Sequence, residues 1–197
     1  VITSKPVAPF IGASFGIGKL CNTCEAVSGN VTFKDGDAVN AFKAFLIEVE
    51  RLRRYGFTEG EVLRAKENNL QAYERSVKAA PTRQNSEYVR PLLNNFFFNS
   101  PYLEPEKALE YAKAICGQLN AQILNQMLPQ LLAEKNVLIL YNGPEKEGLV
   151  NPTEAELKEV YAAAKNAEIA PNAEENVNEP LLDVNALKGS KIKKEKK

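Results

Sequence analysis

Apolar residues recur every three or four positions through most of this chain of 197 residues, which is the spacing of amphipathic helices. The clearest case spans residues 41–77. Gly56 ends a first helix there, and Thr58 begins a second, with Glu61 three positions later completing a capping box. The two inner faces are predicted to comprise Phe42, Phe45, Leu46, Val49 and Leu52, then Val62, Leu63, Leu70, Tyr73 and Val77.

The stretch from Phe10 to Ile17 instead alternates with a period of two. Its odd-numbered positions are apolar from Ile11 onward, and its even-numbered positions are glycine or serine from Gly12 onward. This pattern predicts a strand with one core face and one very small face. Residues 25–34 are predicted to be its partner strand, with a turn or irregular link at 19–24. Asp37 then stands where it can cap the following helix.

Helical periodicity returns in four further segments: residues 82–99, 106–119, 120–132 and 153–166. Pro91 should kink or divide the first of them, and Pro129 should bend the third. Asn120 is predicted to be an N-cap, and Thr153 with Glu156 forms a second capping box. The anchors of 82–99 are predicted to be Tyr88, Val89, Leu92, Leu93, Phe96 and Phe97, and the inside of 106–119 is predicted to hold Leu109, Ala112, Ile115, Cys116 and Leu119.

Val137 to Tyr141 is a short, continuous apolar run that predicts a central strand covered on at least one face. With the two N-terminal strands and the helices, it predicts an α+β fold, in which long helices pack on one face of a mainly antiparallel sheet. We expect one partial domain over residues 1–180. Residues 167–183 are acidic and interrupted by proline, which predicts an extended linker, and 181–197 are predicted to be a linker or flexible lysine-rich tail.

Charge and composition narrow the function classes. Lys and Arg number 25, as do Asp and Glu, so no net positive charge points to nucleic acid. No apolar run reaches the length of a transmembrane helix. The chain opens on Val1 without a signal peptide, which predicts a processed chain or a fragment of a longer one.

Cys21 and Cys24 have the spacing of a redox pair or of half a zinc site, and Cys116 is the only other thiol. Three interpretations stay open for the pair: turn cysteines without chemistry, a disulfide, and a metal or redox role. The chain contains no histidine. Its carboxylates are explained as helix caps or solvated helix faces, and no calcium or magnesium loop is present in the sequence.

Phe96, Phe97 and Phe98 are three consecutive aromatic residues on a predicted helix. Consecutive helical positions are about 100° apart, so the three side chains cannot all face one core. Beside a core role, the cluster is therefore a candidate contact for peptide or for another domain.

Several of these stretches together resemble the pitrilysin/insulinase family of zinc peptidases, over roughly residues 8–180. They are ERLRRYGFTEGEVLRAK, SEYVRPLLNNFFFN, NVLILYNGPEKEGLVNPTEAELKEV and PFIGASFGIG. The zinc site of that family is a His-x-x-Glu-His helix with a further Glu downstream. This sequence has no histidine to form it. Active members also supply an Arg and a Tyr near the stretch that matches SKPVAPFIG, where this chain has Lys5 and Phe10.

The resemblance therefore implies a non-catalytic domain, the second of a multidomain zinc metallopeptidase, with no catalytic or metal-binding residue of its own. Zinc is expected in the catalytic domain of the parent protein. The implied partners are other domains of the same polypeptide or a catalytic partner subunit, and unfolded peptide. Bacterial relatives imply a periplasmic or cell-envelope location. The alternatives are a structural or partner subunit of a catalytically dead family member, and an unrelated enzyme that uses carboxylates or the Cys21/Cys24 pair.

Overall fold

The computed structural model describes residues 9–21, 23–133 and 136–172. The predicted tail at 181–197 and most of the predicted linker at 167–183 lie outside these residues. The elements are β1 (Gly12–Cys21), β2 (Cys24–Thr32), α1 (Ala38–Tyr55), α2 (Glu59–Ala79), η2 (Ala80–Thr82), α3 (Asn85–Phe98), α4 (Pro105–Gln118), α5 (Ala121–Leu131) and α6 (Glu154–Lys165). The predicted α+β class is confirmed.

The N-terminal strands form an antiparallel hairpin, as predicted. The predicted core face of the first strand is wrong: Ile11, Phe15 and Ile17 are 62%, 37% and 47% exposed, since the sheet has only these two strands among the described residues. The register of the hairpin runs from the Gly12–Thr32 pair to the Cys21–Cys24 pair, with one irregularity between Lys19 and Cys21. The predicted link at 19–24 is wrong, because both strands continue to the cysteines. Antiparallel strands need only a very short turn, so the ladder can extend almost to the hairpin tip.

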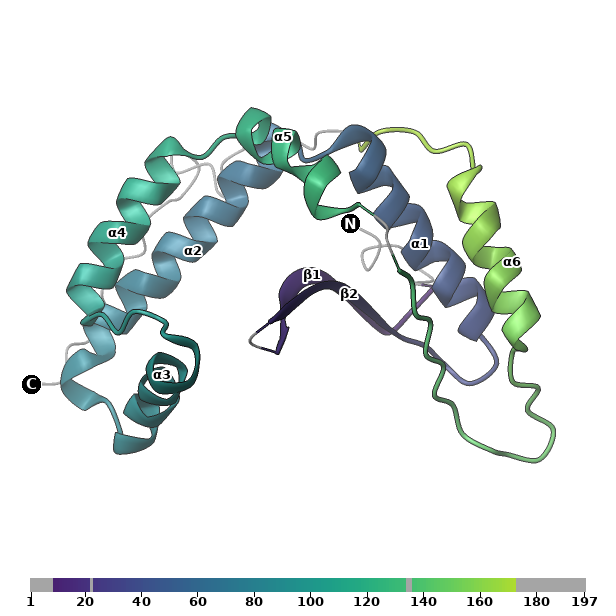
Figure 1. The fold of residues 1–197 in the computed structure, drawn as a ribbon, viewed down its shortest axis with the longest axis horizontal. Coiled ribbons are helices and arrows are strands. Elements are labelled where there is room, and N and C mark those ends of the chain that lie inside the picture. Colours follow the sequence, from purple (N-terminus) through teal and green to yellow (C-terminus); the bar gives the residue numbers. More distant parts are fainter. Residues whose placement is uncertain (1–8, 22, 134–135, 173–197) are drawn as a thin grey trace, which may run out of the picture.

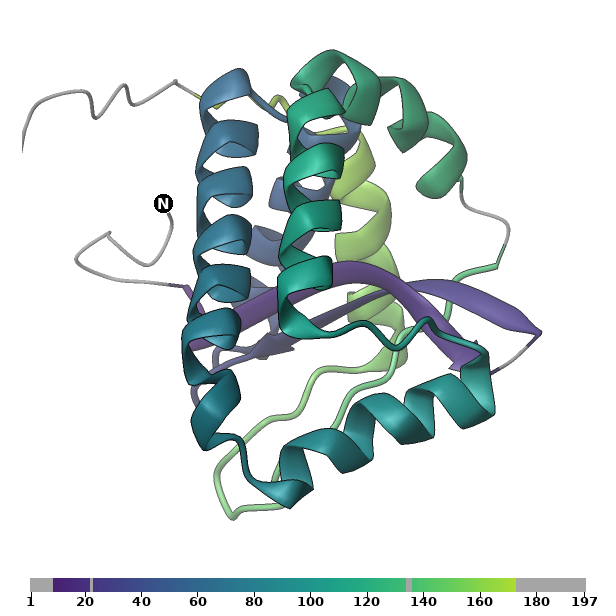
Figure 2. The ribbon, with the colours of Figure 1, turned by 90° about the vertical axis from the view of Figure 1, so that its left-hand side faces the viewer.

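The helices form an arch over this hairpin (Figure 1). On one side α1 packs along α6, and on the other α2 packs along α4, with α5 near the top of the arch. We call these the α1/α6 pair and the α2/α4 pair. Helix α3 crosses beneath the far end of the α2/α4 pair (Figure 2). The two pairs meet at the turn between α1 and α2.

Helix α1 lies against the hairpin because a glycine makes room for it. The rings of Phe15 on β1 and Phe45 on α1 meet edge to face, with centroids 6.2 Å apart. A Cβ atom at Gly29 of β2 would stand 2.3 Å from the Phe45 ring. Helix α1 contributes four buried residues to the structure: Ala38, Ala41, Leu46 and Glu50.

The prediction of a central strand at Val137 to Tyr141 is wrong for this structure. The segment forms no strand, and Leu138 and Leu140 are 80% and 84% exposed. The Tyr141 ring stacks on Phe33, just beyond β2, at a centroid distance of 5.8 Å. Among the described residues, β1 and β2 pair only with each other. Residues 137–141 therefore add no third strand to the sheet, and they contact its end through the Tyr141 ring.

Most predicted helix starts are confirmed by their side-chain bonds. The Glu61 N–H donates to Thr58 Oγ1 at 3.2 Å, and the Thr58 N–H donates to Glu61 Oε2 at 2.9 Å. The box of Thr153 and Glu156 has the same two bonds. The Ile123 N–H donates to Asn120 Oδ1 at 2.8 Å.

Two helix starts differ from the prediction. Asp37 stands at the N-cap of α1, but its side chain makes no capping bond. The helix predicted from residue 82 starts instead at Asn85, because η2 holds the chain in a 3₁₀ turn before it. Glu87 caps it instead, because its Oε2 accepts from the Gln84 N–H at 2.9 Å, while the Glu87 N–H donates to the Gln84 carbonyl at 3.0 Å. Helix α3 then runs through Pro91 without dividing.

Candidate functional site: an apolar groove along α2 and α4

The α1–α2 turn is held in place by α5. Gly56 has a φ of 70°, a conformation that glycine adopts without strain. The Phe57 N–H donates to Asn125 Oδ1 at 2.8 Å, and Asn125 Nδ2 donates to the Phe57 carbonyl at 3.0 Å. A Cβ atom at Gly56 would stand 2.4 Å from Asn125 Oδ1. The turn therefore needs glycine both for its backbone angle and for the approach of Asn125.

A second set of polar contacts joins α2 to the end of α4. Lys66 Nζ donates to the Leu119 carbonyl at 3.0 Å, which satisfies a backbone acceptor at the end of α4. The Ala121 N–H at the start of α5 approaches Glu59 Oε2 at 3.5 Å. These contacts fix α2, α4 and α5 relative to one another.

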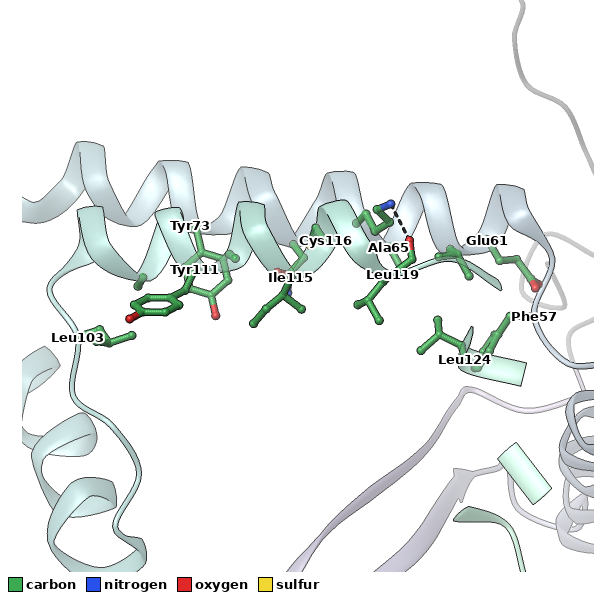
Figure 3. Close-up of a pocket in the computed structure, with 15 residues that line it drawn as sticks. Phe57, Glu61, Ala65, Tyr73, Leu103, Tyr111, Ile115, Cys116, Leu119 and Leu124 are labelled. Atoms are coloured by element: carbon green, nitrogen blue, oxygen red, sulfur yellow. Dashed lines mark hydrogen bonds between the residues drawn. The ribbon is translucent and has the colours of Figure 1, made fainter. Parts of the chain in front are cut away.

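The inner side of the α2/α4 pair carries an open groove of about 760 Å³. Figure 3 shows its side chains in a row that hangs from the two helices toward the same open side. Most of them are aliphatic or aromatic: Phe57, Val62, Tyr73, Leu103, Tyr111, Ile115, Leu119 and Leu124. We call this surface the α2/α4 groove. Its volume lies in the range of sites that bind small molecules or a few side chains.

The two charged residues that line the groove already serve the helix ends. Glu61 completes the capping box of α2, and Lys66 holds the Leu119 carbonyl. The thiol-bearing residue of the lining, Cys116, is buried. A site made chiefly of apolar side chains can bind apolar groups of a partner, and its chemistry favours binding over acid–base catalysis.

Two side chains that were predicted to lie in the core, one on α4 and one on α2, are exposed in the structure. Ile115 was predicted to lie inside, and it is more than half exposed because it faces the groove. Leu63 of α2 was also predicted to lie inside, and it is exposed as well. Helix α2 buries Val62 alone. The sequence signal for the groove was present in the apolar positions of 106–119, but the pattern does not say whether anything covers them.

Cys21 and Cys24 lie opposite each other at the hairpin tip, and both thiols are exposed and free. A hydrogen bond between Cys21 Sγ and Thr23 Oγ1, 3.5 Å apart, lowers the pKa of the Cys21 thiol. The disulfide interpretation is not realised in this structure. Within the described ranges, no group of three or more His, Cys, Asp or Glu residues is arranged to hold a metal ion.

Phe96, Phe97 and Phe98 are 80%, 58% and 44% exposed. Helix α3 buries none of its residues, so the core interpretation of the cluster and of the other predicted anchors is wrong for this chain by itself. The rings contact one another instead, with the centroids of Phe96 and Phe97 5.1 Å apart. Their role as a contact for peptide or for another domain stays a prediction.

In the described part of the chain, no helix is both long and apolar enough to cross a membrane.

Comparison with known proteins gives likeness in structure only. No protein-family model matches the sequence, and no curated protein does. The periplasmic protease PqqL from Escherichia coli matches over 92% of this chain with a TM-score of 0.71 and 18% identity. A predicted insulinase family protease from Yersinia pestis matches over 79% with a TM-score of 0.59 and 16% identity. The ferredoxin protease FusC, in complex with Arabidopsis ferredoxin, matches over 83% with a TM-score of 0.58 and 18% identity.

The chain is much shorter than these proteins. It spans 20% of the PqqL chain, 18% of the FusC chain and 33% of the Yersinia pestis chain. The matches extend over most of the present chain, which has a pitrilysin/insulinase-like fold.

Proposed function

We propose, starting from a fold shared with insulinase-family proteases, that this chain is a non-catalytic domain of a multidomain zinc metallopeptidase. In this proposal it contributes an apolar wall to the chamber that encloses unfolded peptide, and it packs against other domains of the same polypeptide. The α2/α4 groove carries the proposal. It is an open apolar surface that can accept the side chains of an extended peptide.

The non-catalytic role rests on the sequence. The His-x-x-Glu-His zinc site of the family requires histidine ligands, and this chain has none. We assign zinc to the catalytic domain of the parent protein and to no residue here. PqqL is described as a periplasmic protease, and we propose the periplasm or cell envelope for this chain on that likeness. Fractionation of cells that express the whole protein tests the location.

The first experiment tests whether the chain is a non-catalytic domain or an enzyme in its own right. The purified chain is dialysed and its metal content is measured by elemental analysis, beside cleavage of an unfolded casein with and without added zinc. We expect no stoichiometric metal and no cleavage. Near one zinc per chain with chelator-sensitive cleavage would overturn the non-catalytic assignment and favour a site built from cysteines and carboxylates.

The second experiment tests the groove. Binding of fluorescein-labelled unfolded casein is followed by fluorescence anisotropy for the wild-type chain and two variants of α4. Ile115→Asp places a charge in the groove, and Ala114→Asp places the same charge on the adjacent exposed position outside it. Burial of an isoleucine contributes about 1.5–3 kcal/mol, so Ile115→Asp should weaken binding roughly tenfold or more. Equal binding by both variants would contradict a role for the groove.

A further inference from the structure

The chain that follows α6 is fastened across the end of α1 by three side chains. Arg54 donates to the carbonyls of Ala167 and Lys165 at 2.7 and 2.6 Å. The Tyr55 hydroxyl donates to the Ile169 carbonyl at 2.6 Å, and Arg51 donates to the Ala170 carbonyl. We call residues 165–172 the strap. Four backbone acceptors within it are thus satisfied by α1.

The strap leads to the groove. At its last described residue, Asn172 Nδ2 donates to Glu61 Oε1 at 3.3 Å, and Glu61 lines one end of the groove. The bonds to α1 therefore do more than satisfy the end of α6. They place the end of the strap, at Asn172, beside the α2/α4 pair.

The sequence beyond the strap contains a short apolar segment of matching chemistry. Between acidic residues and a lysine-rich end lie Leu181, Leu182, Val184, Ala186 and Leu187. Leu181 lies nine positions after Asn172, and an extended chain of that length reaches about 30 Å. The groove follows α2 from Glu61 to Tyr73, a helical rise of about 18 Å. The segment can therefore reach every part of the groove.

We propose that residues 181–187 occupy the α2/α4 groove, so that the chain covers its own apolar surface. A segment tethered by a short linker experiences an effective concentration of about millimolar, so even weak apolar contacts populate the bound form. The groove is then a competed site, which a peptide enters by displacing the segment. This inference requires only the groove and the tether, and it does not depend on the proposed protease role.

The chain lacks tryptophan, so one introduced indole reports its own surroundings. In the full chain, Leu182→Trp should emit at shorter wavelength than Lys194→Trp and should be quenched severalfold less by acrylamide. Adding Ile115→Asp should shift the emission of the Leu182→Trp chain to longer wavelength, whereas adding Ala114→Asp should not. Far-UV circular dichroism checks that each variant retains its helices.

Three results would overturn the proposal. The Leu182→Trp indole could be as exposed to water as the Lys194→Trp indole. Its emission could stay at short wavelength in the Ile115→Asp background, which would place the indole elsewhere. The shift could depend on protein concentration, which would make a second copy the occupant.

A separate readout distinguishes this proposal from the peptide-chamber proposal. Leu182→Asp should raise the affinity for labelled casein severalfold, because it removes the competitor. The tryptophan experiment contains no peptide, so its failure overturns only the self-covering segment. Absence of casein binding by both the wild-type and the Leu182→Asp chain contradicts only the peptide role.

Discussion

Helices α1 and α2 are amphipathic helices of the same kind, one in each pair, yet they differ in how many of their own residues they bury. Helix α1 has 18 residues and buries four of them. Helix α2 is longer, with 21 residues, and buries Val62 alone. Helix α1 meets both α6 and, through the Phe15–Phe45 contact and Gly29, the hairpin, whereas the inner side of the α2/α4 pair carries the open groove.

The covered pair even contains a buried carboxylate. Glu50 is 8% exposed and pairs with Arg53 at 3.4 Å and with Arg54 at 3.9 Å. A charge can be buried where partners on the same helix compensate it. The α2/α4 pair instead has apolar side chains that the described residues leave open. An amphipathic face therefore shows that a helix has an apolar side, and only the packing of other segments decides whether that side is buried.

The largest effect should come from removing a covered side chain. Leu46→Ala in α1 should lower the free energy of unfolding by about 2–5 kcal/mol, because it leaves a cavity in the core. Leu92→Ala in α3, where the side chain is half exposed, should change it by about 0.5 kcal/mol or less. Denaturation in urea, followed by circular dichroism, measures both. Equal losses would mean that α3 is as well covered as α1.

The joint between the pairs should be the next most sensitive position. Gly56→Ala forces a side chain into a positive φ and against Asn125, at a cost of about 1–3 kcal/mol. Gly117→Ala in α4 is the matched control, since a Cβ there meets nothing within 4 Å. In a helix, alanine should stabilise relative to glycine by about 0.5–1 kcal/mol. The same sign for both variants in thermal unfolding would contradict the described joint.

A smaller loss is expected at the start of α6. Thr153→Ala removes the hydroxyl that accepts from the Glu156 N–H, and loss of such a cap costs about 1 kcal/mol. Thr153→Ser retains the hydroxyl and should restore most of the stability. Urea denaturation of the three proteins checks the cap, and a serine variant no better than alanine would argue against it.

The smallest effect should be a pH dependence of the same cap. Hydrogen bonds from the Thr153 N–H and hydroxyl to its carboxylate hold the pKa of Glu156 below its ordinary value of 4.5. The stabilisation is therefore complete above pH 4.5 and is lost as the pH falls through the lower folded-state pKa. Relative to Glu156→Gln, the wild-type chain should lose its advantage in melting temperature at acid pH. A difference that is constant with pH would exclude this role.

Local patterns were sufficient for most of the secondary structure. The capping boxes at Thr58 and Thr153, the cap at Asn120 and the existence of the two N-terminal strands all depend on neighbours a few residues apart. They were therefore predictable without the fold. Two predicted helix starts were wrong: Asp37 made no capping bond, and the helix predicted from residue 82 began at Asn85.

Which apolar side chains are buried was decided only by the tertiary structure. The sequence gives Val137 to Tyr141, the three phenylalanines of α3 and Ile115 the apolar character of a core, and the structure leaves most of these side chains exposed. Whether a side chain is buried depends on which distant segment lies opposite it, and periodicity carries no information about that segment. The sequence by itself determined where most helices begin, that the N-terminal stretch forms a hairpin and that these 197 residues contain no histidine for a metal site. Only the three-dimensional arrangement decided that α1 meets the hairpin through Gly29 and Phe45 while the α2/α4 pair keeps an open groove.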